Sequence, residues 1–135
     1  MPVKAKQKEL AKALRDRPLV IGVTGHRDLI PTEIPGIEAL VRELFAELLL
    51  HFPGRSLTVM SPLAEGADRI VALVAEDLGI DLVVPLPLAE AVYARDFESS
   101  RSWAEFGRLM GYASEVTILP LVPGSTHESV ADYGP

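Results

Sequence analysis

Two short polar segments hold most of the residue types that could bind a ligand. The first is Thr24-Gly25-His26-Arg27-Asp28, which follows an apolar run. Arg27 offers a rigid fork of donors that suits phosphate or carboxylate, and Gly25 lets a ligand approach the main chain. His26 could donate a hydrogen bond or stack on a base. The same segment is equally consistent with a tight turn that carries a surface Arg–Asp pair, and it matches neither a GxGxxG fingerprint nor a P-loop.

The second segment, Ser-Pro-Leu-Ala-Glu-Gly-Ala-Asp-Arg, leads from a strand directly into a helix. The small residues around Gly66 let a ligand reach the free N–H groups at the helix N-terminus, where the helix dipole favours an anion. Glu65 and Asp68 are either acids of the first helical turn or groups that hold ribose hydroxyls or orient Arg27 and Arg69. The candidate ligand-binding residues of this segment are Ser61, Ala64, Glu65, Gly66, Ala67 and Asp68.

A third candidate segment is Tyr93-Ala94-Arg95-Asp96-Phe97, which follows Pro-Leu-Pro. Tyr93 could stack on a base. Because Phe97 lies four residues further along a helical pattern, the two rings could instead pack together on the domain.

The sequence offers little for catalysis or for metal binding. His26, His51 and His127 have no metal-ligand spacing, no Gly-x-Ser-x-Gly elbow occurs, and the chain has no cysteine. Glu65 and Asp68 are the only carboxylates placed for acid–base work. We therefore assign no catalytic residue, metal ligand or cofactor from the sequence, and we expect His51 to be structural.

The elements that position these segments alternate between strand and helix. Short links between them predict parallel strands with right-handed crossovers, so we expect an α/β fold, a Rossmann-like three-layer sandwich with a mostly parallel sheet. Ligands bind beyond the carboxyl ends of such strands, where the candidate segments fall. We predict helices at 5–15, 37–50, 67–78 and 89–97, a further helix capped by Ser99 or Ser100, and strands at 19–24, 56–60, 81–86 and 116–121, with a loop at 28–36.

Charge divides the chain into a basic start and an acidic body. Six basic and two acidic residues give residues 1–17 a charge of +4. Because the net charge of the chain is −6, the remainder carries −10. An acidic body argues against general nucleic-acid binding, and the basic start is expected to be a solvated helical arm. No apolar run is long enough to span a membrane, and the lack of cysteine is consistent with a cytoplasmic protein.

The two loop motifs, Val-Thr-Gly-His-Arg-Asp and Ser-Pro-Leu-Ala-Glu-Gly-Ala-Asp-Arg, together resemble the SLOG superfamily. This group contains DprA, the LOG-type phosphoribohydrolases and the molybdenum-cofactor carrier proteins. The resemblance is closest to a bacterial branch with Gly-His-Arg and Ala-Glu-Gly-Ala-Asp motifs, covers residues 18–135, and extends to the Tyr93 segment. The resemblance implies a Rossmann-like fold that binds nucleotides or nucleotide-derived ligands. Some members of the group sense such ligands, and others cleave the N-glycosidic bond of nucleoside monophosphates.

The chain departs from the hydrolase members of that group. Their Pro-Gly-Gly-x-Gly-Thr…Glu motif has no match here beyond a faint echo at 123–126. Relatives continue past the equivalent of residue 135 with a strand and a glycine-rich loop, so the chain looks like the first portion of the usual domain. We expect a basic arm at 1–17, a Rossmann-like domain at 18–122 and a tail at 123–135.

Three functions follow as hypotheses from the sequence. The first is a non-enzymatic module that binds or senses a nucleotide-type small molecule, with the anion on the helix that begins near Gly66 and Arg27 as its charge partner. The second is a nucleotide N-glycosidic-bond hydrolase with Glu65 or Asp68 as acid or base. The third is a structural or oligomerisation domain. A homodimer could form through the helix at 37–50 or the helix carrying Trp103.

Overall fold

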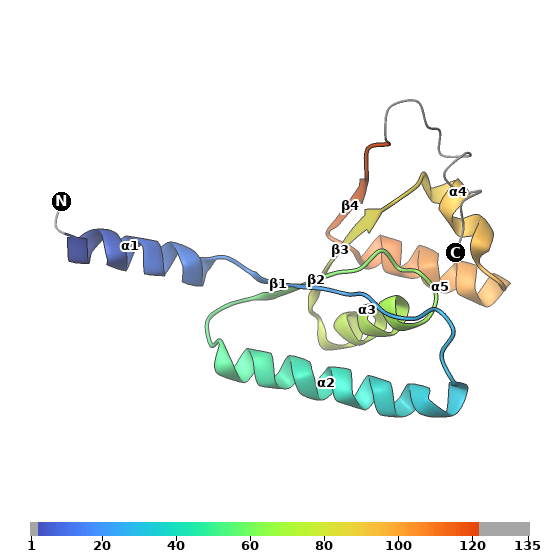
Figure 1. Cartoon of the computed structure of the whole chain (residues 1–135), viewed down its shortest axis with the longest axis horizontal. Helices are drawn as coiled ribbons and strands as arrows, with labels where there is room; N and C mark the ends of the chain where they lie inside the picture. The colour runs from blue at the N-terminus through green and yellow to red at the C-terminus, as the bar shows by residue number, and fades with distance from the viewer. Residues whose placement is uncertain (1–2, 122–135) are drawn as a thin grey trace.

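The computed structural model describes residues 3–121 and contains one parallel sheet with its helices (Figure 1). The strands are β1 (Leu19–Gly22), β2 (Leu57–Met60), β3 (Asp81–Leu86) and β4 (Glu115–Ile118). The helices are α1 (Val3–Asp16), α2 (Ile34–His51), α3 (Ala67–Leu78), α4 (Glu90–Tyr93) and α5 (Ser100–Tyr112), with the 3₁₀ turns η1 (Pro31–Glu33) and η2 (Ala94–Asp96).

The sheet confirms the predicted α/β class and its Rossmann-like parallel topology. All neighbouring strands pair in parallel in the order β1-β2-β3-β4. The register places Ile21 beside Val59, and Val59 beside Leu82. The loops that follow β1, β2 and β3 therefore leave the sheet at one edge, as the sequence predicts for the candidate segments.

The core lies between the sheet and the helices on one of its faces. Val59, Leu82 and Val84 are fully buried on this face and belong to one apolar cluster that also includes Phe45 of α2 and Leu109 of α5. The sequence forms this cluster because strand residues alternate between faces, and the helices repeat their apolar residues every three or four positions.

The opposite face of the sheet is much more accessible. It carries Val20, Met60, Val83 and Pro85, of which Val20 is 53% and Met60 39% exposed. Figure 1 shows α2, α3 and α5 on the other side of the strands, while α1 projects away from the domain. Within residues 3–121, the sheet thus has one helical layer and one open face.

The element boundaries differ from the predictions in a few places. The predicted loop at 28–36 contains η1 and the start of α2, because Pro35 lies in the first turn, where a helix needs no N–H from it. The predicted helix at 89–97 is a single short turn followed by η2. Strands β1 and β4 are shorter than predicted. The tail from residue 123 lies outside the described residues.

The predicted serine cap is confirmed, and α3 ends with a glycine cap. Ser99 is the N-cap of α5, with its side chain accepting a hydrogen bond of 3.0 Å from the Ser102 N–H. Gly79 ends α3 in the left-handed conformation. None of the helices in residues 3–121 combines the length and the apolar character that crossing a bilayer requires.

Candidate functional site

The loops that follow β1 and β2 are in direct backbone contact. The N–H of Ala67, the first residue of α3, donates a hydrogen bond of 3.0 Å to the carbonyl oxygen of His26. Gly25 lies so close to Ala67 that a Cβ at position 25 would be 2.5 Å from the Ala67 Cβ. The prediction that these two loops meet at one edge of the sheet is therefore confirmed, and the glycine of the first loop permits the approach.

The loop after β2 has an unusual backbone. Leu63 is fully buried with a φ of 60°, and Gly66 has a φ of 92°. A Cβ at Gly66 would collide with the carbonyl oxygens of His26 and Arg27. Non-glycine residues adopt positive φ only where their surroundings impose it, and such positions gather at functional sites. The packing between the two loops thus requires glycine at position 66.

Ser61 holds this loop from the inside. It is completely buried, and its hydroxyl donates to the Asp68 carbonyl oxygen at 2.8 Å while accepting from the Leu63 N–H at 3.2 Å. The first bond joins the loop to the first turn of α3, and the second closes the loop on itself. We therefore assign Ser61 a positioning role, in contrast to the expected contact with a ligand.

Arg69 is a buried cation, 3% exposed, whose guanidinium makes several hydrogen bonds. Its Nη1 donates to the backbone oxygen and the hydroxyl of Ser102 at 3.0 and 2.6 Å, and its Nη2 donates to the Leu63 carbonyl oxygen at 3.1 Å. The guanidinium also lies 4.5 Å from the centre of the Phe97 ring and 3.5 Å from the Glu105 carboxylate. Arg69 thus connects the second loop to α5.

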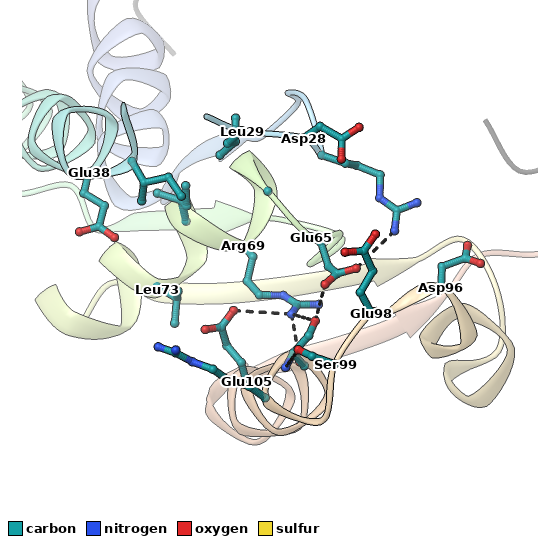
Figure 2. A pocket seen from close by; sticks show the side chains of 16 residues that line it. Asp28, Leu29, Glu38, Glu65, Arg69, Leu73, Asp96, Glu98, Ser99 and Glu105 are labelled. Carbon is teal, nitrogen blue, oxygen red and sulfur yellow. Dashed lines mark hydrogen bonds and ion pairs between the residues drawn. The ribbon is translucent and has the colours of Figure 1, made fainter. Parts of the chain in front are cut away.

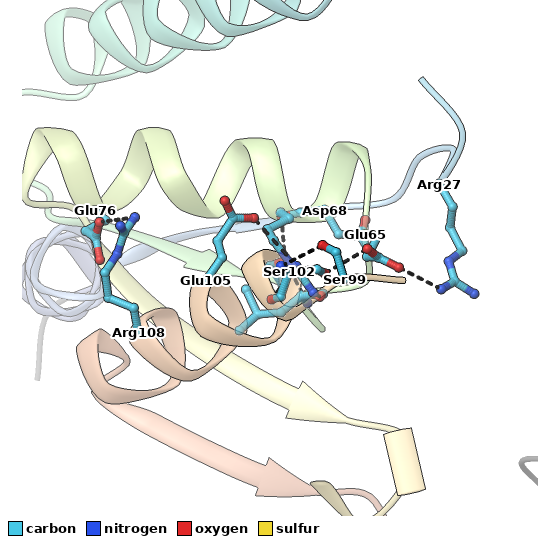
Figure 3. Close-up of polar contacts among 11 residues, drawn as sticks. Arg27, Glu65, Asp68, Glu76, Ser99, Ser102, Glu105 and Arg108 are labelled. Atoms are coloured by element: carbon cyan, nitrogen blue, oxygen red, sulfur yellow. Dashed lines mark hydrogen bonds and ion pairs between the residues drawn. The ribbon is translucent and has the colours of Figure 1, made fainter. Parts of the chain in front are cut away.

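Glu65 extends this polar chain toward the first loop (Figure 3). Its Oε2 accepts a hydrogen bond of 2.7 Å from the Ser102 hydroxyl, and its Oε1 lies 3.7 Å from Nη2 of Arg27. Of the roles predicted for Glu65, the structure shows the one in which its carboxylate pairs with Arg27 and orients it. The Arg27 side chain is itself 37% exposed and remains accessible to a ligand.

Asp68 is buried, unlike the other acids of the site. It is 8% exposed, and its Oδ1 has no hydrogen-bond partner within the described part of the chain. Burial raises the pKa of this carboxyl above its usual range. A buried carboxyl with a raised pKa is a recognised mark of a functional site, because desolvation is costly unless a partner compensates for it.

Tyr93 connects the third segment to the same place. Burial and, second, the negative charge of Asp68 raise the pKa of the Tyr93 hydroxyl to about 12, against an opposing contribution from Arg27. Its ring packs edge-on against Phe97, 5.8 Å away between centroids, and against Phe106. The structure therefore contains the predicted Tyr93–Phe97 packing.

A pocket of about 900 Å³ opens where the three segments meet (Figure 2). Arg27 and Asp28 come from the loop after β1, Glu65 from the loop after β2, and Asp96 from the segment after β3. The lining holds three arginines and six acidic residues, so its formal charge is −3. Its charged residues are Arg27, Asp28, Glu38, Glu65, Arg69, Asp96, Glu98, Arg101 and Glu105.

The N-terminus of α3 offers fewer free donors than the sequence suggests. The Ala67 N–H is bonded to His26, and the Arg69 N–H is bonded to the Gly66 carbonyl oxygen at 3.2 Å. Two of the three leading N–H groups are thus satisfied within the protein. An anion held mainly by this helix terminus, as expected from the sequence, would have to displace the first loop.

Of the ten residues predicted for the site, Arg27, Glu65 and Gly66 line the pocket and the other seven do not. His26 is exposed, and Ala64 is half-buried beside Glu65. His51 is away from the site and bonds through Nδ1 to the backbone oxygen of Glu47 at 2.8 Å, as expected for a structural residue. The sequence reasoning missed Ser102 and Glu105, which reach the site from α5. The sequence signal that could have located them is the Ser99 cap, because it fixes the first turn of α5, which holds Ser102.

Comparison of the chain with models of protein families and with curated protein sequences finds no match. Within residues 3–121, no group of three histidine or acidic side chains is arranged to hold a metal ion.

Proposed function

We propose that the protein binds a nucleotide or a nucleotide-derived small molecule in the pocket at the carboxyl edge of the sheet. One observation carries the proposal: the segments after three successive parallel strands line a single pocket. Open α/β sheets bind ligands at this edge. The loop resemblance to the SLOG superfamily supports the same ligand class.

The charges of the lining favour a ligand with few phosphates. Arg27 can pair with one phosphate, but Arg69 is already occupied by Ser102 and Leu63. The surplus of carboxylates would repel a polyphosphate and would accept hydrogen bonds from ribose hydroxyls or a base amino group. A nucleoside monophosphate or an ADP-ribose-like ligand is therefore expected to bind more tightly than a triphosphate.

Calorimetric titration and thermal shift with adenosine, AMP, ATP, ADP-ribose and cyclic dinucleotides test this proposal. We expect Arg27→Ala to weaken binding by about tenfold or more, because a charge-assisted hydrogen bond contributes ~1.5–3 kcal/mol. Arg108→Ala is the matched control. Arg108 is exposed on α5, does not line the pocket, and pairs with Glu76 of α3 (Figure 3). Absence of saturable binding by every compound would reject the proposal and favour a purely structural domain.

Glu65, a carboxylate in the pocket lining, supports a second candidate, hydrolysis of an N-glycosidic bond, with the buried Asp68 of the adjoining helix turn outside that lining. A general acid must keep its proton near neutral pH, and burial moves the pKa of Asp68 in that direction. Release of free base from AMP-type substrates, lost in both Asp68→Asn and Glu65→Gln, would favour this function. Binding without release of base would favour the non-enzymatic module.

A further inference from the structure

We propose that α1 packs on the open face of the sheet of a second copy of this chain, and that the exchange is reciprocal. The open face is on the other side of the sheet from the helical layer, so this contact is independent of the proposed ligand. Both surfaces are exposed, and a short linker joins α1 to the sheet.

Within residues 3–121, the apolar stripe of α1 is exposed and has no partner. Val3 and Leu10 are seven residues apart, which places them on one side of the helix, and they are 70% and 62% exposed. An isolated helix of about this length is marginal in water, since most helical stability in proteins comes from packing an apolar face. Figure 1 shows α1 extending beyond the sheet.

The linker between α1 and β1 is held in this outward direction. The Leu19 N–H donates to the Ser56 carbonyl oxygen at 2.8 Å, and Arg55 donates to the carbonyl oxygens of Arg17 and Pro18 at 3.1 and 3.5 Å. Pro18 also restricts Arg17 to extended conformations. A short linker fixed in this way favours exchange of the element between copies over its return to its own domain.

The open face supplies a matching surface. Its apolar centre consists of Val20 of β1, Met60 of β2 and Val83 of β3. Asp81 and Glu115 add carboxylates to the same face. On α1, Lys4 and Lys6 lie on the two flanks of the apolar stripe, where they can reach the carboxylates of the face it packs on. The basic helix and the acidic body are thus complementary in charge.

Other occupants of α1 are less consistent with its residues. In a coiled coil of two α1 helices with Val3 and Leu10 in the seam, Lys4 and Lys6 would flank that seam, so like charges would face each other. Helices that lie in a membrane surface usually bury Trp or Phe, and α1 has neither. A reciprocal exchange satisfies both copies and closes after two, which predicts a dimer and no larger assembly.

Engineered disulfides test the exchange directly, because the natural chain contains no cysteine. A Leu10→Cys chain mixed with a Met60→Cys chain should give a covalent mixed dimer on oxidation. The double variant Leu10→Cys/Met60→Cys should give covalent dimers, with two bridges in each. Glu47→Cys, at an exposed position on α2, replaces Met60→Cys as the matched control and should not couple.

The outcomes separate the alternatives. A bridge within one chain of the double variant would mean that α1 folds back on its own sheet, and absence of any bridge would mean that α1 does not reach this face. Equal coupling to Glu47→Cys would mean random collision. Each of these results would overturn the proposal. Light scattering of the unmodified chain should show twice the mass of one chain, and Lys4→Glu/Lys6→Glu should reduce it to a monomer.

Discussion

The two loops of the site differ in how much of their chemistry the fold already uses. In the loop after β2 and the first turn of α3 that it leads into, Ser61, Leu63 and Arg69 are buried and joined to one another and to α5 by hydrogen bonds. In the loop after β1, His26 is exposed and Arg27 retains an accessible guanidinium. The loop with the richer sequence motif is thus mainly a support, and the plainer loop presents groups to a ligand.

The difference teaches that a dense motif can encode geometry more than contact. Gly66 and Ser61 allow the second loop to turn sharply into α3, and the resulting helix start holds the His26 carbonyl through Ala67. Only after this arrangement is built does Arg27 come within reach of Glu65. Substitutions should therefore affect stability in the second loop and ligand response in the first.

The largest expected effect comes from Arg69→Ala. It leaves the carbonyl oxygens of Leu63 and Ser102 without their donor and removes the cation over Phe97. Breaking such a buried charged network costs about 3–5 kcal/mol of unfolding free energy, measured from urea denaturation. Arg27→Ala, which removes an exposed pair, should change stability by no more than about 0.5 kcal/mol. Equal losses in the two variants would contradict the comparison.

Gly66→Ala should come next, with a loss of about 3 kcal/mol. The added Cβ would collide with the backbone of the first loop, and the positive φ would strain an alanine in addition. Gly107→Ala is the matched control, because Gly107 lies in α5 with open space around it. That control should gain about 0.5–1 kcal/mol through helix propensity. Thermal unfolding of both variants measures the contrast, and a tolerated Gly66→Ala would show that the loops can separate.

Gly25→Ala should cost about 1–3 kcal/mol, because its new methyl group would overlap the Cβ of Ala67. The reason is specific, so it can be tested by rescue. In Gly25→Ala/Ala67→Gly, the methyl group moves across the contact and most of the loss should disappear in denaturant unfolding. A double variant that is no more stable than Gly25→Ala would mean that the strain arises elsewhere in the first loop.

Much of the fold could be predicted from the sequence, since strands such as Leu82–Leu86 and helices such as Ala67–Leu78 carry clear apolar periods and local end signals. The site was harder to predict because its bonds are long-range. Nothing local to Arg69 indicates that Ser102 and Glu105 will meet it, and nothing local to His26 indicates that its carbonyl oxygen will take the first N–H of α3. Sequence patterns locate loops, whereas packing decides which groups remain free.

The smallest expected effect on stability is a pH dependence at Asp68, which lies in the first turn of α3 and has one oxygen without a partner among residues 3–121. Burial raises its pKa in the folded protein, so the native state holds this proton to higher pH than the unfolded chain does. Stability should therefore fall as pH rises from the ordinary carboxyl range through the raised pKa, and then level off. Asp68→Asn should remove this fall. Denaturant midpoints across the acidic pH range measure this pH dependence, and Asp28→Asn at an exposed position is the control. Parallel pH profiles for the wild type and Asp68→Asn would show that ionisation of Asp68 does not lower stability.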